Sequence, residues 1–221
     1  MACIVEALEA THRGGIIHRD LKPENLVFDS AGYLRLTDFG IARVWAPENA
    51  QETSGTPGYM APEVLFKQNH GVAADYFAVG VITYELVFGQ RPYRGRQRRE
   101  IRDAILNKAI TVRKQDLPHG FNEHCAEFIT QCLARHPHKR LGMNGIDEVK
   151  LHPWFADFDW AALRKREIEA PFKPNMDAQN YDDHHVNGRK WNDTEMLADK
   201  VELLRRASQH KIFDGYSYSR D

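Results

Sequence analysis

The fold of this chain is decided by residues 18–25, which read His-Arg-Asp-Leu-Lys-Pro-Glu-Asn. Residues 25–28 (Asn-Leu-Val-Phe) and 33–36 (Tyr-Leu-Arg-Leu) follow, and each has the apolar content of a short strand. The four residues between the two, Asp-Ser-Ala-Gly at 29–32, are typical of a turn. The sequence therefore predicts a charged loop that leads into a β-hairpin, and the hairpin returns the chain close to that loop.

The segment ahead of the loop is predicted to be an amphipathic helix ending near His12. Ile4, Leu8 and Val5 lie on one face at helical spacing, and Gly14-Gly15 is a stop signal. No basic region followed by an apolar core is present, so this is not a signal peptide. A chain that begins inside a helix indicates that a further segment precedes it.

Beyond the hairpin the sequence predicts a long loop and then a helical domain. Residues 42–59 are irregular and polar, and a loop of that length is usually functional or disordered. The pattern is then helical to about residue 155, and residues 76–88 are apolar on nearly all sides, as in a buried central helix. Asn122 is a plausible N-cap. After Phe155 the composition shifts, and residues 170–194 predict an extended tail.

Composition excludes several classes of protein. Hydrophobic residues make up 42% and charged residues 28% of the 221, and the net charge is −1, so nothing favours nucleic acid or an anionic membrane. The basic run at 94–102 is interpreted as a solvated face. No apolar run reaches the roughly 20 residues of a membrane span. The odd number of cysteines, without a Cys-x-x-Cys spacing, favours buried thiols and a reduced, cytoplasmic setting.

Three motifs in order identify a resemblance to the protein kinases. Residues 18–25 match His-Arg-Asp-x-x-x-x-Asn, residues 38–40 are Asp-Phe-Gly, and residues 61–63 are Ala-Pro-Glu. The chain resembles serine/threonine kinases of the AGC group. The resemblance implies a mainly α large, C-terminal kinase lobe with a short β-hairpin over residues 1–155, an extended AGC tail over 156–221, and ATP with Mg²⁺ as cofactors.

The chemistry of phosphoryl transfer gives the motif residues their expected roles. Asp20 would accept the proton of the substrate hydroxyl, and Lys22 would steady the transferring phosphate. Asn25 and Asp38 carry hard oxygen ligands of the kind that Mg²⁺ prefers, and the hairpin brings their loops together. In the family, the threonine that corresponds to Thr56 bonds the catalytic aspartate and lysine and marks Ser/Thr specificity.

Regulation is expected at the segment between residues 38 and 63. In kinases, the residue at Arg19 commonly pairs with a phosphate on this segment, which contains Thr53. The usual AGC phosphothreonine position is Glu52 in this chain. One hypothesis is that Glu52 supplies Arg19 with a fixed negative partner, although a carboxylate brings less charge than a phosphate. A solvent-facing Glu52 is an equally acceptable reading.

The resemblance also implies structural and substrate-binding residues. Glu63 should pair with Arg140 in a buried ion pair, and Asp75 should hold the backbone of the loop at 18–25. Glu24 and Glu85 match acidic positions that read arginines in the substrates of basophilic members, although Glu85 could instead balance only local charge. Protein substrates with basic residues near the target are therefore the expected partners.

Further features place the resemblance in the AGC group. Arg-Leu-Gly at 140–142 precedes His-Pro-Trp-Phe at 152–155, and residues 159–174 resemble the start of an AGC tail. Residues 213–218, Phe-Asp-Gly-Tyr-Ser-Tyr, resemble the hydrophobic motif that closes such tails. By resemblance, Ser217 is a regulatory phosphorylation site, which implies an upstream kinase.

A glycine-rich loop, a strand lysine and its helix glutamate cannot be placed in the sequence. These belong to the N-terminal lobe, so the chain is expected to supply only the lower wall of an ATP site and to have little activity alone. Two hypotheses follow. In the first, the chain is the C-terminal part of an active kinase. In the second, it is an inactive short lobe that binds substrates or partners.

Overall fold

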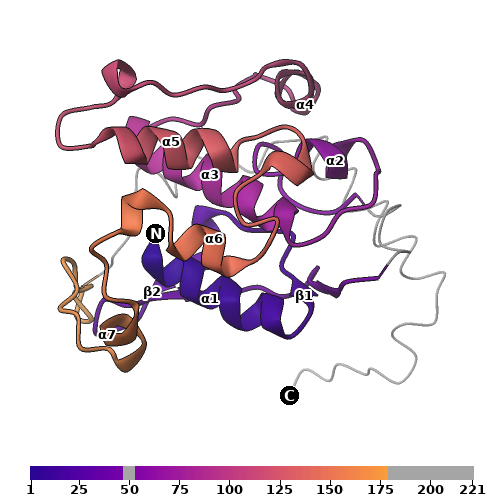
Figure 1. Cartoon of the computed structure of the whole chain (residues 1–221). Helices are drawn as coiled ribbons and strands as arrows, with labels where there is room; N and C mark the ends of the chain where they lie inside the picture. Colours follow the sequence, from indigo (N-terminus) through magenta and orange to yellow (C-terminus); the bar gives the residue numbers. More distant parts are fainter. Residues whose placement is uncertain (47–52, 179–221) are drawn as a thin grey trace, which may run out of the picture. The chain divides into compact units, whose positions relative to one another are not determined.

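The computed structural model describes residues 1–46 and 53–178 (Figure 1). The helices are α1 (Ala2–Arg13), α2 (Pro62–Leu65), α3 (Ala73–Phe88), α4 (Arg98–Asn107), α5 (Glu123–Cys132), α6 (Ile146–Lys150) and α7 (Trp160–Lys165). Short 3₁₀ turns are η1 (Pro23–Asn25), η3 (Lys114–Asp116), η4 (Pro137–Lys139) and η5 (Pro153–Phe155). The strands are β1 (Ile16–Ile17), β2 (Leu26–Phe28), β3 (Leu34–Leu36) and β4 (Arg43–Val44). This confirms the predicted mainly α lobe with a short hairpin.

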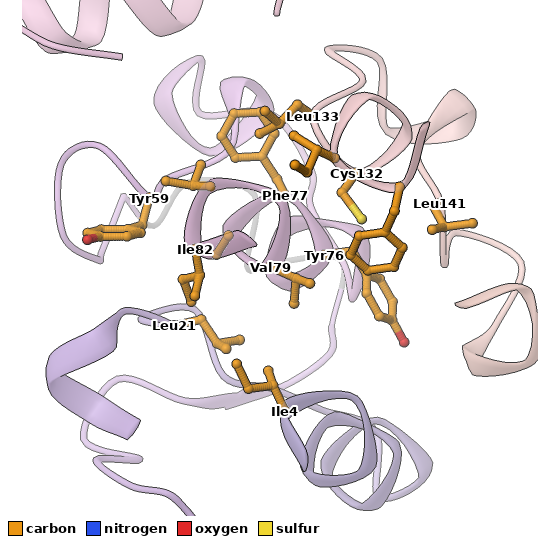
Figure 2. Close-up of a cluster of buried hydrophobic side chains, with 14 of the residues drawn as sticks. Ile4, Leu21, Tyr59, Tyr76, Phe77, Val79, Ile82, Cys132, Leu133 and Leu141 are labelled. Atoms are coloured by element: carbon orange, nitrogen blue, oxygen red, sulfur yellow. The ribbon is translucent and has the colours of Figure 1, made fainter. Parts of the chain in front are cut away.

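Helix α3 is the centre of the unit formed by Met1–Pro174, and it lies between α5 and α1 (Figure 1). Every residue from Ala73 to Thr83 is buried, as the uniformly apolar sequence predicted. Figure 2 shows side chains of α1, of the loop at Leu21 and of α5 converging on Phe77, Val79 and Ile82 of this helix. The site residues are therefore attached to a rigid core.

Close packing of α3 on α5 depends on Gly80. A Cβ atom at this position would lie 2.7 Å from the Cβ of Cys132, closer than two such carbons can approach. Cys125 and Cys132 of α5 are both buried free thiols, as predicted. Burial raises the pKa of the Cys125 thiol to about 11, and it raises that of Cys132 further. Both side chains therefore act as small apolar groups.

Two small antiparallel sheets position the functional loops. Strands β2 and β3 form the predicted hairpin, with Leu26 opposite Leu36. A second sheet pairs β1 with β4, with Ile16 opposite Val44. The expectation of one hairpin and an irregular segment from residue 42 was therefore incomplete, because two-residue strands have no pattern that sequence alone can reveal.

The N-termini of two helices are capped by side chains. The Asn122 side chain accepts a hydrogen bond from the Cys125 amide at 3.1 Å, which confirms the predicted N-cap of α5. The Asp159 side chain accepts one from the Ala162 amide at 2.9 Å and begins α7. Helix α7 was not expected, because the composition shift after Phe155 masks it.

Charged side chains of α6 and α7 form ion pairs with two glutamates of α1. The Lys150 ammonium donates to a carboxylate oxygen of Glu6 at 2.5 Å and to one of Glu9. The Arg164 guanidinium of α7 donates to both carboxylates at 3.0 Å. Further along, the Tyr33 hydroxyl of the hairpin donates to the Ile168 carbonyl at 2.6 Å.

In the part of the chain that the structure describes, no helix is long and apolar enough to cross a membrane.

Candidate active site

Asp20, Lys22 and Thr56 form a closed triangle of hydrogen bonds. The Lys22 ammonium donates to Asp20 Oδ2 at 2.6 Å and to Thr56 Oγ1 at 2.8 Å. The Thr56 hydroxyl in turn donates to Asp20 Oδ1 at 2.7 Å. The structure thus brings together the three residues predicted to be catalytic, although Thr56 lies on a different loop from the other two.

This triangle keeps Asp20 ionised. Burial by itself raises the pKa of the carboxyl group, but the hydrogen bonds from Lys22 and Thr56 and the charge of Lys22 outweigh burial and lower the pKa below its ordinary value. At neutral pH the side chain is therefore a carboxylate that can accept a hydrogen bond or a proton but cannot donate one.

Asn25 is oriented by the backbone and side chain of Asp20. Its amide nitrogen donates to the Asp20 carbonyl at 2.8 Å and to Asp20 Oδ2 at 3.2 Å. Both donor interactions engage the same end of the Asn25 amide. The amide oxygen is not used by either of these bonds, and it is a metal ligand by its chemistry.

Asp38 lies at the same open end of the hairpin as Asn25. The Thr37 amide donates to the Asn25 carbonyl at 2.9 Å, and Asp38 is the next residue. The Asp38 side chain is exposed, and its Oδ1 accepts a hydrogen bond from the Gly40 amide at 3.1 Å. Its backbone has φ = 62°, a left-handed conformation that is uncommon for residues other than glycine and often marks a functional position.

The donor set of Asn25 and Asp38 fits Mg²⁺ bound together with a nucleotide. Among the described residues, no group of three or more His, Cys, Asp and Glu side chains could hold a metal ion. Mg²⁺ is commonly bound by one or two carboxylates, with phosphate oxygens and water completing its octahedron. Two protein ligands, with phosphate oxygens and water to complete the coordination, agree with this preference of Mg²⁺.

Asp75 holds the backbone that leads into the catalytic loop. Its two carboxylate oxygens accept hydrogen bonds from the amides of His18 at 2.9 Å and Arg19 at 2.8 Å. The His12 ring of α1 contributes a further contact to Asp75 at 2.8 Å. Arg19 has φ = 69°, so its left-handed backbone is maintained by these contacts. The role of His12 was not predicted, because its partner lies 63 residues away.

Glu63 and Arg140 form a buried bidentate ion pair, as the sequence predicted for these positions. The guanidinium donates to the two carboxylate oxygens at 2.6 and 2.9 Å. It also donates to the carbonyls of Ala73 at 2.8 Å and Ala134 at 3.0 Å. The pair therefore joins α2, the start of α3 and the segment after α5.

The predicted regulatory residues are only partly described. Arg19 Nε donates to the Ile41 carbonyl at 2.7 Å, so the side chain lies against the segment that begins at Asp38. Thr53 is exposed. Glu52 and Ser217, with the motif at 213–218, lie outside the described residues.

Glu24 and Glu85, the predicted substrate-binding acids, both lie close enough to Tyr59 for their charges to act on its hydroxyl group. The Tyr59 hydroxyl donates to Glu85 Oε2 at 2.5 Å. Burial, followed by the bond to Glu85 and the charges of both acids, raises the pKa of Tyr59 far above its ordinary value. Arg91 lies over the other side of this tyrosine, 5.8 Å from the ring centroid. Sequence reasoning missed Tyr59 and Arg91, which no local pattern connects.

An apolar surface borders the Asn25–Asp38 pair. Val27, Phe28 and Phe39 are 45%, 49% and 47% exposed, although each sits in or next to the hairpin. Phe39 packs edge-on against the His18 ring, with a centroid separation of 4.9 Å. Behind the hairpin, a mostly apolar cavity of about 610 Å³ extends to Leu86 of α3.

A loop with an ionised aspartate, a lysine beside it and the oxygen donors Asn25 and Asp38 nearby is an arrangement typical of protein kinases. A model of the protein kinase domain matches residues 1–155, and the chain belongs to this family, in its AGC group. It is 34% identical over 220 residues to mouse ribosomal protein S6 kinase alpha-6, covering 99% of this chain and 28% of that protein.

Two further relatives support the same assignment. A probable serine/threonine-protein kinase of Dictyostelium discoideum is 34% identical over 226 residues, which covers 100% of this chain and 47% of that protein. Human cGMP-dependent protein kinase 2 is 36% identical over 179 residues, which covers 80% of this chain and 23% of that protein. The chain thus spans less than half the length of each of these relatives.

Proposed function

We propose that this chain supplies the catalytic lobe of a serine/threonine protein kinase that transfers the γ-phosphate of ATP to protein hydroxyls. In this proposal residues 1–155 are the C-terminal lobe and residues 156–221 are an AGC-type tail. The observation that carries it is the triangle of Asp20, Lys22 and Thr56, next to Asn25 and Asp38. The names of the relatives support the same reaction class.

The proposed mechanism follows from the positions of these groups. Asp20 accepts a hydrogen bond from the substrate hydroxyl, orients its oxygen and takes up its proton during transfer. Lys22, already beside Asp20, places positive charge where the transferring phosphate gains negative charge. Thr56 fixes both side chains and limits the space for an acceptor, which favours a serine or threonine side chain.

ATP and Mg²⁺ are the cofactors in this proposal. Asn25 and Asp38 would hold the cation, which when bound offsets the charge of the phosphates. The exposed apolar surface at Val27 would contact the base from below. A second lobe would have to cover the nucleotide from above, so we expect the 221-residue chain alone to bind ATP poorly and to transfer phosphate slowly.

Glu24 and Glu85 support a preference for substrates with arginine near the target residue. Glu24 is exposed, and Glu85 accepts only the Tyr59 hydroxyl among the described residues. Two carboxylates at the edge of the site can form charge-assisted hydrogen bonds to a guanidinium.

The test begins with the endogenous protein, captured with an antibody against residues 205–221, and its measured mass. The protein is then produced at that length as wild type and as Asp20→Asn. We expect a mass well above 25.5 kDa, phosphate transfer to arginine-containing serine peptides, and a loss of about a hundredfold or more in Asp20→Asn.

Two results would contradict the proposal. Equal activity of Asp20→Asn and wild type would remove Asp20 from the reaction. A 25.5 kDa endogenous protein that binds the peptides but transfers no phosphate would favour the alternative, a lobe that acts as a substrate- or partner-binding module.

A further inference from the structure

Arg91 covers the backbone immediately after Thr56, in the segment between residues 38 and 63, which we call the activation segment. Gly58 is buried, and a Cβ atom built on it would lie 2.8 Å from Nη1 of Arg91 and 3.8 Å from the nearest atom of Ile101. The absence of a side chain at Gly58 thus makes room for the guanidinium. Gly58 also has φ = 99°, so a larger residue there would be strained as well as displacing Arg91.

The Arg91 charge is not cancelled by the acidic pair beside it. Its guanidinium carbon lies over the Tyr59 ring, whereas the hydroxyl end of the same ring bonds Glu85. No ion pair of Arg91 occurs within the described parts of the chain. The Tyr59 hydroxyl is therefore bonded to an acid, Glu85, while Arg91 lies over the ring of the same side chain.

The chain that follows Arg91 is rich in arginine. Arg91 is half-buried, and the chain continues through exposed Arg94 and Arg96 into α4, which packs against α2. Ile101 of α4 contributes to the cover of Gly58, so the N-terminal half of this basic helix lies close to the activation segment. The basic run of residues 94–102, whose arginines are exposed as the interpretation of a solvated face predicts, thus reaches Gly58 through Ile101. A cluster of arginines attracts anions, and guanidinium groups bind carboxylate and phosphate with paired hydrogen bonds.

We propose that Arg91 binds an anionic side chain of the protein substrate, at a position different from the one that Glu85 reads. This inference rests on the proposed kinase function and deepens it. The preferred substrate then carries both an arginine, for Glu24 and Glu85, and an aspartate, glutamate or phosphorylated residue, for Arg91. A kinase that selects this mixed pattern rejects substrates that are merely basic.

The experiment is a positional scan with the complete kinase and serine peptides that hold one arginine fixed. Each other position near the serine is varied in turn to alanine, glutamate, phosphoserine and arginine, and kcat/KM is measured. At one position we expect glutamate or phosphoserine to exceed alanine by about tenfold, as one charge-assisted hydrogen bond provides. Glutamate and phosphoserine in separate peptides show which source of charge is preferred.

Arg91→Ala should abolish that preference and leave the dependence on the fixed arginine intact. Arg91→Glu should reverse the preference, so that arginine is favoured at the same position. Arg94→Ala is the matched control, because this exposed arginine lies on the same segment but does not contact Gly58, and it should retain the preference.

Three outcomes would overturn the inference: no position that favours an anion, a preference unchanged by Arg91→Ala, or a preference lost equally in Arg94→Ala. Each of these is distinct from failure of the proposed function, in which no peptide is phosphorylated. The melting temperature of each variant, measured in parallel, separates a lost preference from a lost fold.

Discussion

Thr56 is the residue whose single hydroxyl group touches both of its catalytic neighbours. It accepts from Lys22 and donates to Asp20, so it fixes two side chains at once. We predict that Thr56→Ala lowers the kcat of the complete kinase by about tenfold to a hundredfold, the equivalent of losing one hydrogen bond to a charged group. Steady-state kinetics on a serine peptide measure the effect. Thr56→Ser, which keeps the hydroxyl, should restore most of the rate.

The lowered pKa of Asp20 leads to a prediction about pH. A carboxyl group with a lowered pKa stays ionised as the pH falls, so activity is lost only when the pH passes below that pKa. Lys22→Met removes the largest of the lowering influences, so that burial, which raises the pKa of Asp20, is opposed only by the hydrogen bonds from Thr56. The acidic limb of kcat/KM should therefore move to higher pH in Lys22→Met.

Lys22→Arg is the control for charge, and its acidic limb should stay closer to that of the wild type. An acidic limb at the same pH in Lys22→Met and wild type would show that Asp20 does not control this limb.

Motif residues could be predicted at this scale, whereas their supporting partners could not. Asp20, Asn25 and Asp38 lie in short stretches whose spacing is set by one loop and one hairpin. His12 and Tyr59 act on partners 63 and 26 residues away, so only the folded chain reveals them. The contact of Arg91 with Gly58 is of the same kind, since its sequence signal is merely a glycine and a distant arginine.

At the scale of elements, the Glu63–Arg140 pair joins α2 to the start of α3. Removing one partner leaves a buried, unpaired charge, so we predict that Glu63→Ala lowers the free energy of unfolding by about 3–5 kcal/mol. Urea denaturation of the 221-residue chain and of the complete kinase measures this difference. Glu123→Ala, in an exposed pair with Lys114 at 3.5 Å, should cost about 1 kcal/mol or less.

A double variant tests whether the stability contributions of Glu63 and Arg140 depend on each other. In Glu63→Leu with Arg140→Met neither charge remains, so its loss of stability should be smaller than the sum of the two single losses. Strict additivity would mean that the two side chains stabilise the fold independently.

Elements with a local signature were predicted well, and elements made by distant contacts were not. Helices α1 and α3 follow from apolar spacing, and the β2–β3 hairpin from its turn sequence. The β1–β4 sheet joins Ile16 to Val44, and neither two-residue strand has an alternation to detect. Helix α7 depends on its N-cap Asp159 and on contacts with α1, which a composition shift does not predict.

At the scale of the whole molecule, the charges of α1, α6 and α7 tie the first helix to the segment after residue 155. Burial raises the pKa of Glu9, but the hydrogen bond and charge of Lys150, with the charges of Arg164 and Arg13, lower it overall. The stability that ionised Glu9 contributes is therefore complete above its ordinary pKa of 4.5 and is lost as the pH falls through the lower, folded value.

We predict that Lys150→Met lowers the free energy of unfolding at pH 7 by about 3 kcal/mol. The difference from the wild type should narrow as the pH falls below 4.5, the ordinary pKa of Glu9, because Glu9 becomes protonated in both proteins. Urea denaturation at several pH values measures both effects. Lys165→Met, an exposed lysine of α7, is the control and should change stability by less than about 0.5 kcal/mol. A difference that is constant with pH would exclude the coupling of Lys150 to Glu9.

The hydrogen bonds around Asp20 also bear on the competition between water and protein for the same phosphate. A carboxylate has about four lone-pair positions, and Thr56, Lys22 and Asn25 engage three of them. The Thr56 backbone is hydrogen-bonded to Asp20 as well, so water and a substrate hydroxyl must compete for the little acceptor capacity that remains. Under the proposed function, hydrolysis of the nucleotide and phosphorylation of a protein would compete at Asp20, so a bound substrate would suppress the loss of ATP to water.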